Sequence, residues 1–207
     1  MHQDEIHHDI EWNGHYEQFG AKDSMTFQNM TLGADGKIRG GGKDAVGEFV
    51  IDGQLTGSDV HFTKAYKGAH TVKYTGKLSN GKISGTWDLS GMNGGFEIQM
   101  KTKQWKGWYE QNGVKTDMLA SIDIHHIAGK RCPIRGLGGD SNGNYCLAGF
   151  QPIAGHNHTV MFTKTYFGQP WKVHYSGVIG KIGGEEKMRG VWTLNDEVGS
   201  FELVKQP

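Results

Sequence analysis

Cysteine and proline are scarce, with two cysteines and four prolines among 207 residues. Two thiols cannot form the dense disulfide framework of a small secreted domain, so the fold must depend on packing and hydrogen bonds. If a hairpin centred near Gly139 joined Cys132 and Cys146, the two would face each other and could form a bridge. Because the rest of the chain is typical of a cytosolic protein, two free thiols are the favoured interpretation.

Excess charge and long apolar runs are also missing. The chain has 22 basic and 22 acidic residues and a pI near 7.2, which excludes the basic surface that nucleic-acid binding requires. The chain contains no run of about 18 apolar residues, the length that a membrane-spanning helix needs. Residues Met1–Glu5 show neither the basic start nor the apolar segment of a secretory signal, so we expect a cytoplasmic protein with no membrane partner.

What the chain does contain is an internal duplication. The motif Trp12-x-Gly14-x-Tyr16-Glu17-Gln18 recurs as Trp105-x-Gly107-x-Tyr109-Glu110-Gln111. The match continues with Val60-x-Phe62-Thr63-Lys64-x-Tyr66 against Val160-x-Phe162-Thr163-Lys164-x-Tyr166. Repeats of this length predict two similar domains, which we place at residues 9–102 and 103–207, joined near Lys103. The first copy has Val50 at the position of Cys146, so that cysteine is not needed by the shared fold.

Each copy shows the pattern of short antiparallel strands. Residues 71–78 and 83–89 alternate apolar and polar side chains, and Asn80-Gly81 between them is a strong hairpin signal. The 33 glycines mark turns and bends in a strongly curved sheet. The strands expected in the first copy are 12–19, 25–32, 37–41, 48–55, 60–66, 71–78, 82–89 and 95–101, with the same order in the second. We therefore predict an all-β protein of two tandem eight-stranded antiparallel up-and-down β-barrels, because closure removes the sheet edges.

The pattern Trp-x-Gly-x-Tyr, then Val-x-Phe-x-Lys-x-Tyr, then Ile83-x-Gly85-x-Trp87 resembles the avidin and streptavidin family and, more loosely, the calycin barrels. This resemblance implies a ligand pocket at one mouth of each barrel. In that family several tryptophans and polar groups bind biotin, and Trp87 and Trp192 sit where one such tryptophan falls. The others are replaced by phenylalanine and tyrosine and the polar set is incomplete, so tight biotin binding is not expected.

Lys64 is the most suggestive residue, because strand alternation places it on the same face as Phe62 and Tyr66, and Lys164 repeats this arrangement. An ammonium among aromatic rings could bind an anionic ligand. Alternatively, its stem covers the rings and its charge extends to solvent at the rim, which is the favoured interpretation. The aromatic candidates could likewise form a stacking wall or simply fill the core. The candidate ligand-binding residues are Lys64, Tyr66, Tyr74, Trp87, Lys164, Tyr166, Tyr175 and Trp192.

Other chemistry-bearing residues have simpler explanations. The resemblance to calycin barrels implies that Trp12 and Trp105, at the first strand of each copy, plug the closed barrel ends. Asp44 and Asp140 occupy equivalent glycine-rich turns, where side-chain bonding to the turn backbone explains them.

The eleven histidines suggest no metal site. His125 and His126 are adjacent and would point to opposite faces of a strand, whereas His156 and His158 could share an ion. No acid or cysteine provides a third ligand, so we expect neither a metal nor another cofactor.

No nucleophile, base and orienting group stand out as a catalytic set, so an enzyme is not favoured. The favoured function is a non-catalytic binding module whose barrels hold a small amphipathic or anionic ligand or a protein partner, including a second copy of the chain. The alternative is a structural subunit of a larger assembly with filled barrels, and a third hypothesis is an isomerase or cyclase working inside a barrel. A cavity lined by Lys64 or Lys164 with Tyr74 or Tyr175 would favour a ligand, and solid packing would favour the scaffold.

Overall fold

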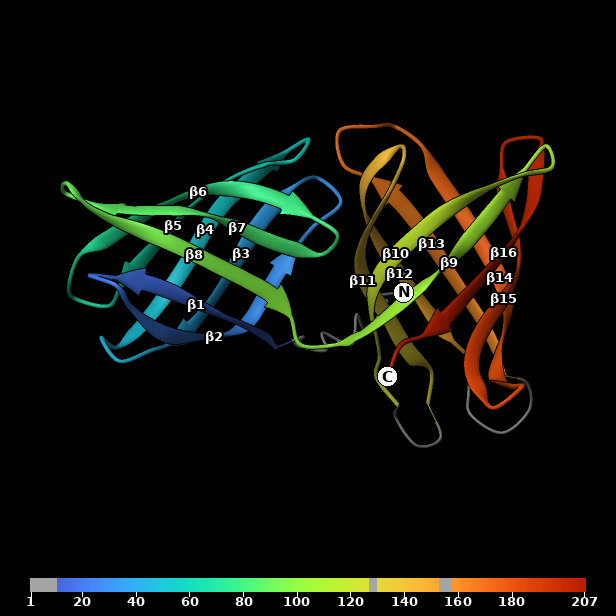
Figure 1. Cartoon of the computed structure of the whole chain (residues 1–207), viewed down its shortest axis with the longest axis horizontal. Helices are drawn as coiled ribbons and strands as arrows, with labels where there is room; N and C mark the ends of the chain where they lie inside the picture. Colours follow the sequence, from blue (N-terminus) through green and yellow to red (C-terminus); the bar gives the residue numbers. More distant parts are fainter. Residues whose placement is uncertain (1–10, 127–129, 153–157) are drawn as a thin grey trace, which may run out of the picture.

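The computed structural model of the chain describes residues 11–126, 130–152 and 158–207, and every regular element within them is a β-strand (Figure 1). The strands form two closed antiparallel barrels in tandem, as the sequence predicts. The first barrel contains β1 (Trp12–Gln18), β2 (Ala21–Leu32), β3 (Lys37–Lys43), β4 (Glu48–Thr56), β5 (Asp59–Tyr66), β6 (Thr71–Ser79), β7 (Lys82–Leu89) and β8 (Met92–Met100). The described residues contain no helix that could cross a membrane.

The second barrel repeats this order. It contains β9 (Lys103–Gln111), β10 (Val114–Ile124), β11 (Cys132–Asp140), β12 (Gly143–Gln151), β13 (Thr159–Tyr166), β14 (Lys172–Ile182), β15 (Glu185–Leu194) and β16 (Glu197–Lys205). Each strand pairs with its neighbours in sequence, and the first and last strands of each barrel pair to close it.

Glycine in the Trp-x-Gly-x-Tyr motif permits this closure. Gly14 pairs with Ile98 across the β1–β8 seam, and a Cβ atom on Gly14 would lie 2.1 Å from the carbonyl oxygen of Glu97. At the equivalent Gly107 a Cβ atom would lie 1.8 Å from the carbonyl oxygen of Glu202. Any side chain here would push the seam strands apart, so the repeated glycine is explained by close backbone approach.

The interior of each barrel is filled at mid-height by aromatic rings. In the first barrel Phe62 stacks on Tyr74 with ring centroids 4.6 Å apart, and the ring of Phe96 meets both edge-on. Phe162, Tyr175 and Phe201 repeat the arrangement in the second barrel. Such offset and edge-on contacts are favourable beyond their burial, so this layer stabilises both barrels.

The two ends of each barrel differ. In the first barrel the end where β1 begins is closed by Trp12, which is 2% exposed, as the sequence predicts. The opposite end, which we call the mouth, carries the turns after β1, β3, β5 and β7. Trp105 is buried at the corresponding closed end of the second barrel.

The closed end of the first barrel packs against the outer wall of the second (Figure 1). Leu137 on β11 points outward from its own barrel and joins the hydrophobic core of the first. The side-chain amide of Asn144 donates a hydrogen bond of 2.7 Å to the carbonyl oxygen of Leu78. Cys146 also packs against the first barrel, whereas Val50 at the equivalent position is 63% exposed. The second copy has therefore diverged where it contacts the first.

The two cysteines are not joined by a disulfide, in agreement with the favoured interpretation from the sequence. The hairpin is centred at Ser141–Asn142 rather than near Gly139, because Asp140 pairs with Gly143. Cys132 consequently lies opposite Gln151 and Cys146 opposite Leu137, so the expectation that the hairpin would make them face each other was wrong.

Candidate functional site

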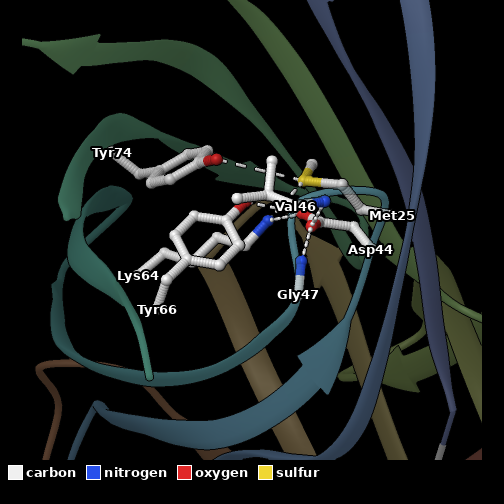
Figure 2. A network of polar contacts seen from close by, with 7 residues as sticks. All are labelled: Met25, Asp44, Val46, Gly47, Lys64, Tyr66 and Tyr74. Carbon is white, nitrogen blue, oxygen red and sulfur yellow. Dashed lines mark hydrogen bonds and ion pairs between the residues drawn. The ribbon is translucent and has the colours of Figure 1, made fainter. Parts of the chain in front are cut away.

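A buried ion pair lies at the mouth of the first barrel (Figure 2). The Lys64 side chain projects inward from β5 and its ammonium contacts the Oδ2 atom of Asp44, which is in the turn after β3. The Tyr66 hydroxyl, two residues farther along β5, donates a hydrogen bond of 2.7 Å to the same oxygen. Both charged side chains are completely inaccessible to solvent.

The second oxygen of Asp44 is held by its own turn. The Oδ1 atom accepts hydrogen bonds from the backbone N–H groups of Val46, at 2.9 Å, and Gly47, at 3.4 Å. The turn bonding expected from the sequence is therefore present. The same carboxylate also reaches the barrel interior, so it joins the mouth turn to strand β5.

The second barrel repeats this arrangement. The Lys164 ammonium lies 2.5 Å from Oδ2 of Asp140, to which the Tyr166 hydroxyl donates at 2.7 Å. The Oδ1 atom of Asp140 accepts a hydrogen bond of 2.8 Å from the backbone N–H of Asn142. Lysine, aspartate and tyrosine thus form the same triad in both copies, although the intervening turn residues differ.

Aromatic rings surround both ammonium groups. The Lys64 Nζ atom lies 4.0 Å from the ring centroid of Phe49 and 5.0 Å from that of Tyr66. The Lys164 Nζ atom lies 4.5 Å from the ring centroid of Tyr145 and 4.7 Å from that of Tyr109. The expectation that the lysine charges extend to solvent at the rim was wrong, because an aspartate inside each barrel pairs with the ammonium and aromatic faces enclose it.

Burial shapes the electrostatics of the triad. It lowers the pKa of Lys64, and the adjacent Asp44 carboxylate opposes this change only in part. Burial alone would raise the pKa of Asp44, but the hydrogen bonds from Lys64 and Tyr66 together bring it below its ordinary value. Burial followed by the Asp44 contact raises the pKa of Tyr66, which keeps this phenol protonated as a donor. The same causes lower the pKa of Lys164 and raise that of Tyr166.

The tryptophan candidates have a structural contact in each barrel. The indole N–H of Trp87 donates to the carbonyl oxygen of Glu17, and that of Trp192 donates to the carbonyl oxygen of Glu110, both at 3.0 Å. These bonds join the seventh strand of each barrel to its first, across the intervening last strand. Trp87 and Trp192 therefore support the mouth in addition to any contact with a ligand.

A cavity of about 270 Å³ opens at the mouth of the second barrel. Four of the predicted ligand-binding residues line it, namely Lys164, Tyr166, Tyr175 and Trp192. The structure adds residues that the sequence argument missed, namely Tyr109, Gln111, Asn142, Trp171, Val173, Leu194 and Glu197. The four predicted side chains are themselves buried, as are the corresponding candidates of the first barrel, Lys64, Tyr66, Tyr74 and Trp87.

The loop after the fifth strand distinguishes the two mouths. In the first copy the His70 ring lies 4.9 Å from the Tyr66 ring. In the second copy Trp171 faces Tyr166 at 6.5 Å and remains 47% exposed. The longer loop of the second copy, with Trp171 in place of histidine, was the available sequence signal for this difference.

The described residues contain no cluster of side chains suited to bind a metal ion. Within the described part of the chain, no three histidine, cysteine, aspartate or glutamate side chains are grouped to hold an ion. His156, one half of the histidine pair considered from the sequence, lies outside the described residues.

Neither a protein-family model nor a curated protein matches this chain.

Proposed function

We propose that the chain is a non-catalytic binding module and that the mouth of the second barrel is its small-molecule site. The observation that carries this proposal is the cavity lined by Lys164 and Tyr175 together with the exposed ring of Trp171. A concave site with aromatic walls and a few polar groups is the usual form of a ligand pocket. At about 270 Å³ the cavity suits a compact ligand with a single ring system.

The charges at this mouth favour an uncharged ligand. The Lys164 ammonium is already paired with Asp140, so it offers no unbalanced positive charge to an anion. Glu197 at the rim is hydrogen-bonded to the side-chain amide of Gln111 and adds a negative charge. An anionic compound would therefore be repelled, and we propose a neutral amphipathic ring compound that stacks on Trp171 and hydrogen-bonds to Asn142.

For the first barrel we infer a supporting role. Its closed end covers Leu137 on β11 and Cys146 on β12, on the outer wall of the second barrel. These two strands meet in the turn at the mouth of that barrel. A rigid neighbour reduces the freedom that β11 and β12 would otherwise lose when a ligand binds, and such preorganisation increases affinity. This assigns the scaffold function to one barrel and the binding function to the other.

The proposal can be tested by ligand-observed NMR, with a library of uncharged ring compounds and carboxylate analogues of the same rings. We expect neutral compounds to bind and their carboxylate analogues to bind more weakly. For a compound that binds, Trp171→Ala should lower the affinity roughly thirtyfold, which corresponds to the loss of about 2 kcal/mol from a stacking contact.

The matched control is His70→Ala, which alters the equivalent loop position of the first barrel and should leave the affinity unchanged. Equal binding to wild type and Trp171→Ala would contradict the assigned site. Preferential binding of the carboxylates would contradict the assigned ligand class.

A further inference from the structure

The lysine–aspartate–tyrosine triads contain the parts needed to form an amide bond. We propose that Lys64 and Asp44, and likewise Lys164 and Asp140, condense spontaneously after folding to form an intramolecular isopeptide bond in each barrel. The site would thus be a self-modification site, and the modification would tie β5 covalently to the turn after β3, and β13 to the end of β11.

The reacting groups are already in contact. The Lys64 ammonium touches the Asp44 carboxylate, and in the second copy the corresponding Nζ–Oδ2 distance is 2.5 Å. Reactants held in this way react as parts of one molecule, which removes most of the entropic barrier to a condensation. Lys64 and Lys164 are 0% and 1% exposed, so bulk water cannot compete for the ammonium or readily reverse the reaction.

The reaction requires a neutral amine and a neutral acid. Transfer of one proton from the Lys64 ammonium to Oδ2 of Asp44 produces both within the pair. Burial favours the uncharged forms, whereas the hydrogen bonds that lower the pKa of Asp44 oppose the transfer. The Nζ lone pair then attacks Cγ of Asp44, forming the C–N bond. The resulting charge develops on Oδ1, which the backbone N–H groups of Val46 and Gly47 already contact.

The remaining step is loss of water. The Tyr66 hydroxyl donates a hydrogen bond to Oδ2, the oxygen that leaves. Cleavage of the Cγ–Oδ2 bond, with transfer of the second Nζ proton to the departing oxygen, gives an amide and one water molecule. No oxidant, reductant or cofactor is consumed. Both protons of the departing water come from Nζ, so Tyr66 keeps its own proton and acts through its hydrogen bond to the leaving oxygen.

The duplication provides an independent comparison of the two sites. Val46-Gly47 in the first turn corresponds to Asn142-Gly143 in the second, and Phe49 corresponds to Tyr145. Despite these changes, both copies retain the lysine, the aspartate, the tyrosine hydroxyl on Oδ2 and a backbone N–H on Oδ1. The groups shared by both copies are therefore the groups that the condensation requires.

The decisive experiment is mass spectrometry of the purified, denatured wild-type chain. We expect a mass lower than that of the sequence by two water molecules, together with branched tryptic peptides that join Asp44 to Lys64 and Asp140 to Lys164. Trypsin should not cut after either lysine, because an amide nitrogen carries no charge. The single variants Lys64→Met and Lys164→Met should each lose one water molecule and the double variant none.

Tyr66→Phe, which keeps the ring and removes the proton donor, should slow formation of the first bond and leave the second unchanged. The full sequence mass in folded wild-type protein would overturn the proposal, as would a loss of water that maps to other residues. Because wild-type protein decides the result, a variant that fails to fold does not affect it, and the outcome is independent of ligand binding at the second mouth.

Discussion

We expect the largest effect on the free energy of unfolding from Lys64→Met, which leaves the buried Asp44 carboxylate without its ammonium partner. In Lys64→Met the unbranched side chain keeps the packing of the lysine stem but leaves a carboxylate in a site that is inaccessible to solvent. Removing one partner of a buried ion pair costs about 3–5 kcal/mol because the other charge is left uncompensated. The double variant Lys64→Met/Asp44→Asn removes both charges. Its new side-chain amide could still accept from the turn N–H groups and donate to the Tyr66 oxygen.

The expected magnitude follows from the contacts that remain on Asp44 in the single variant. It keeps the Tyr66 hydroxyl at 2.7 Å and the backbone N–H groups of Val46 and Gly47. Such hydrogen bonds to a charged group offset part of the cost, so we expect the single variant to be less stable than the double variant by about 2–3 kcal/mol. Neither variant can form the Lys64–Asp44 bond, so their comparison isolates the uncompensated carboxylate.

Urea unfolding at pH 7, followed by far-ultraviolet circular dichroism, measures the free energies of unfolding of both variants. In Lys64→Met the pKa of Asp44 rises because burial is no longer opposed by the ammonium. A raised folded-state pKa favours folding at low pH, so the gap between the variants should close as the pH falls through that pKa. Lys164→Met and Lys164→Met/Asp140→Asn provide the matched pair in the second barrel. Equal stability of the single and double variants at pH 7 would refute this reasoning.

Two further predictions concern the seams and the thiols. Gly107→Ala should destabilise the second barrel by about 2–4 kcal/mol in thermal unfolding, because its Cβ would meet a backbone oxygen 1.8 Å away. Gly180→Ala, whose Cβ would meet nothing within 4 Å, should change stability by no more than about 0.5 kcal/mol, and comparable losses in the two variants would contradict the seam explanation. Burial raises the pKa of Cys146 to about 11, so native protein at pH 8 should react with iodoacetamide at Cys146 far more slowly than urea-unfolded protein. Rapid native alkylation of Cys146 on peptide mapping would show that the contact between the barrels opens.

The sequence by itself determined the architecture, because the strands and turns that build a barrel are specified by local patterns of apolar, polar and turn residues. Alternation in residues 71–78, the Asn80-Gly81 turn and the duplicated motifs were enough to predict two closed barrels and the approximate bounds of their strands. Burial of Trp12 at a closed barrel end, which the resemblance to calycin barrels implies, is also present.

The sequence predicted the lysine of each site but not its aspartate partner. Alternation placed Lys64 on the inward face, but it could not show that Asp44, from a turn 20 residues away, reaches the same point and balances its charge. Whether a lysine extends to solvent or stays inside depends on such a partner, and a partner from another strand is set by barrel closure and register. The same holds for Cys146, whose distance from Cys132 is set by a two-residue turn at Ser141–Asn142.

Only the tertiary structure decided how the two copies differ in packing. Leu137 and Cys146 belong to an ordinary outward face by sequence, yet the first barrel covers them. The cavity beside Trp171 depends on how a loop from β13 to β14 meets Tyr166 and Trp192, which come from different strands. Side chains far apart in sequence meet only after closure. The repeated sequence pattern therefore specifies the barrel fold of both copies, and the packing of barrels and loops specifies how the two mouths differ.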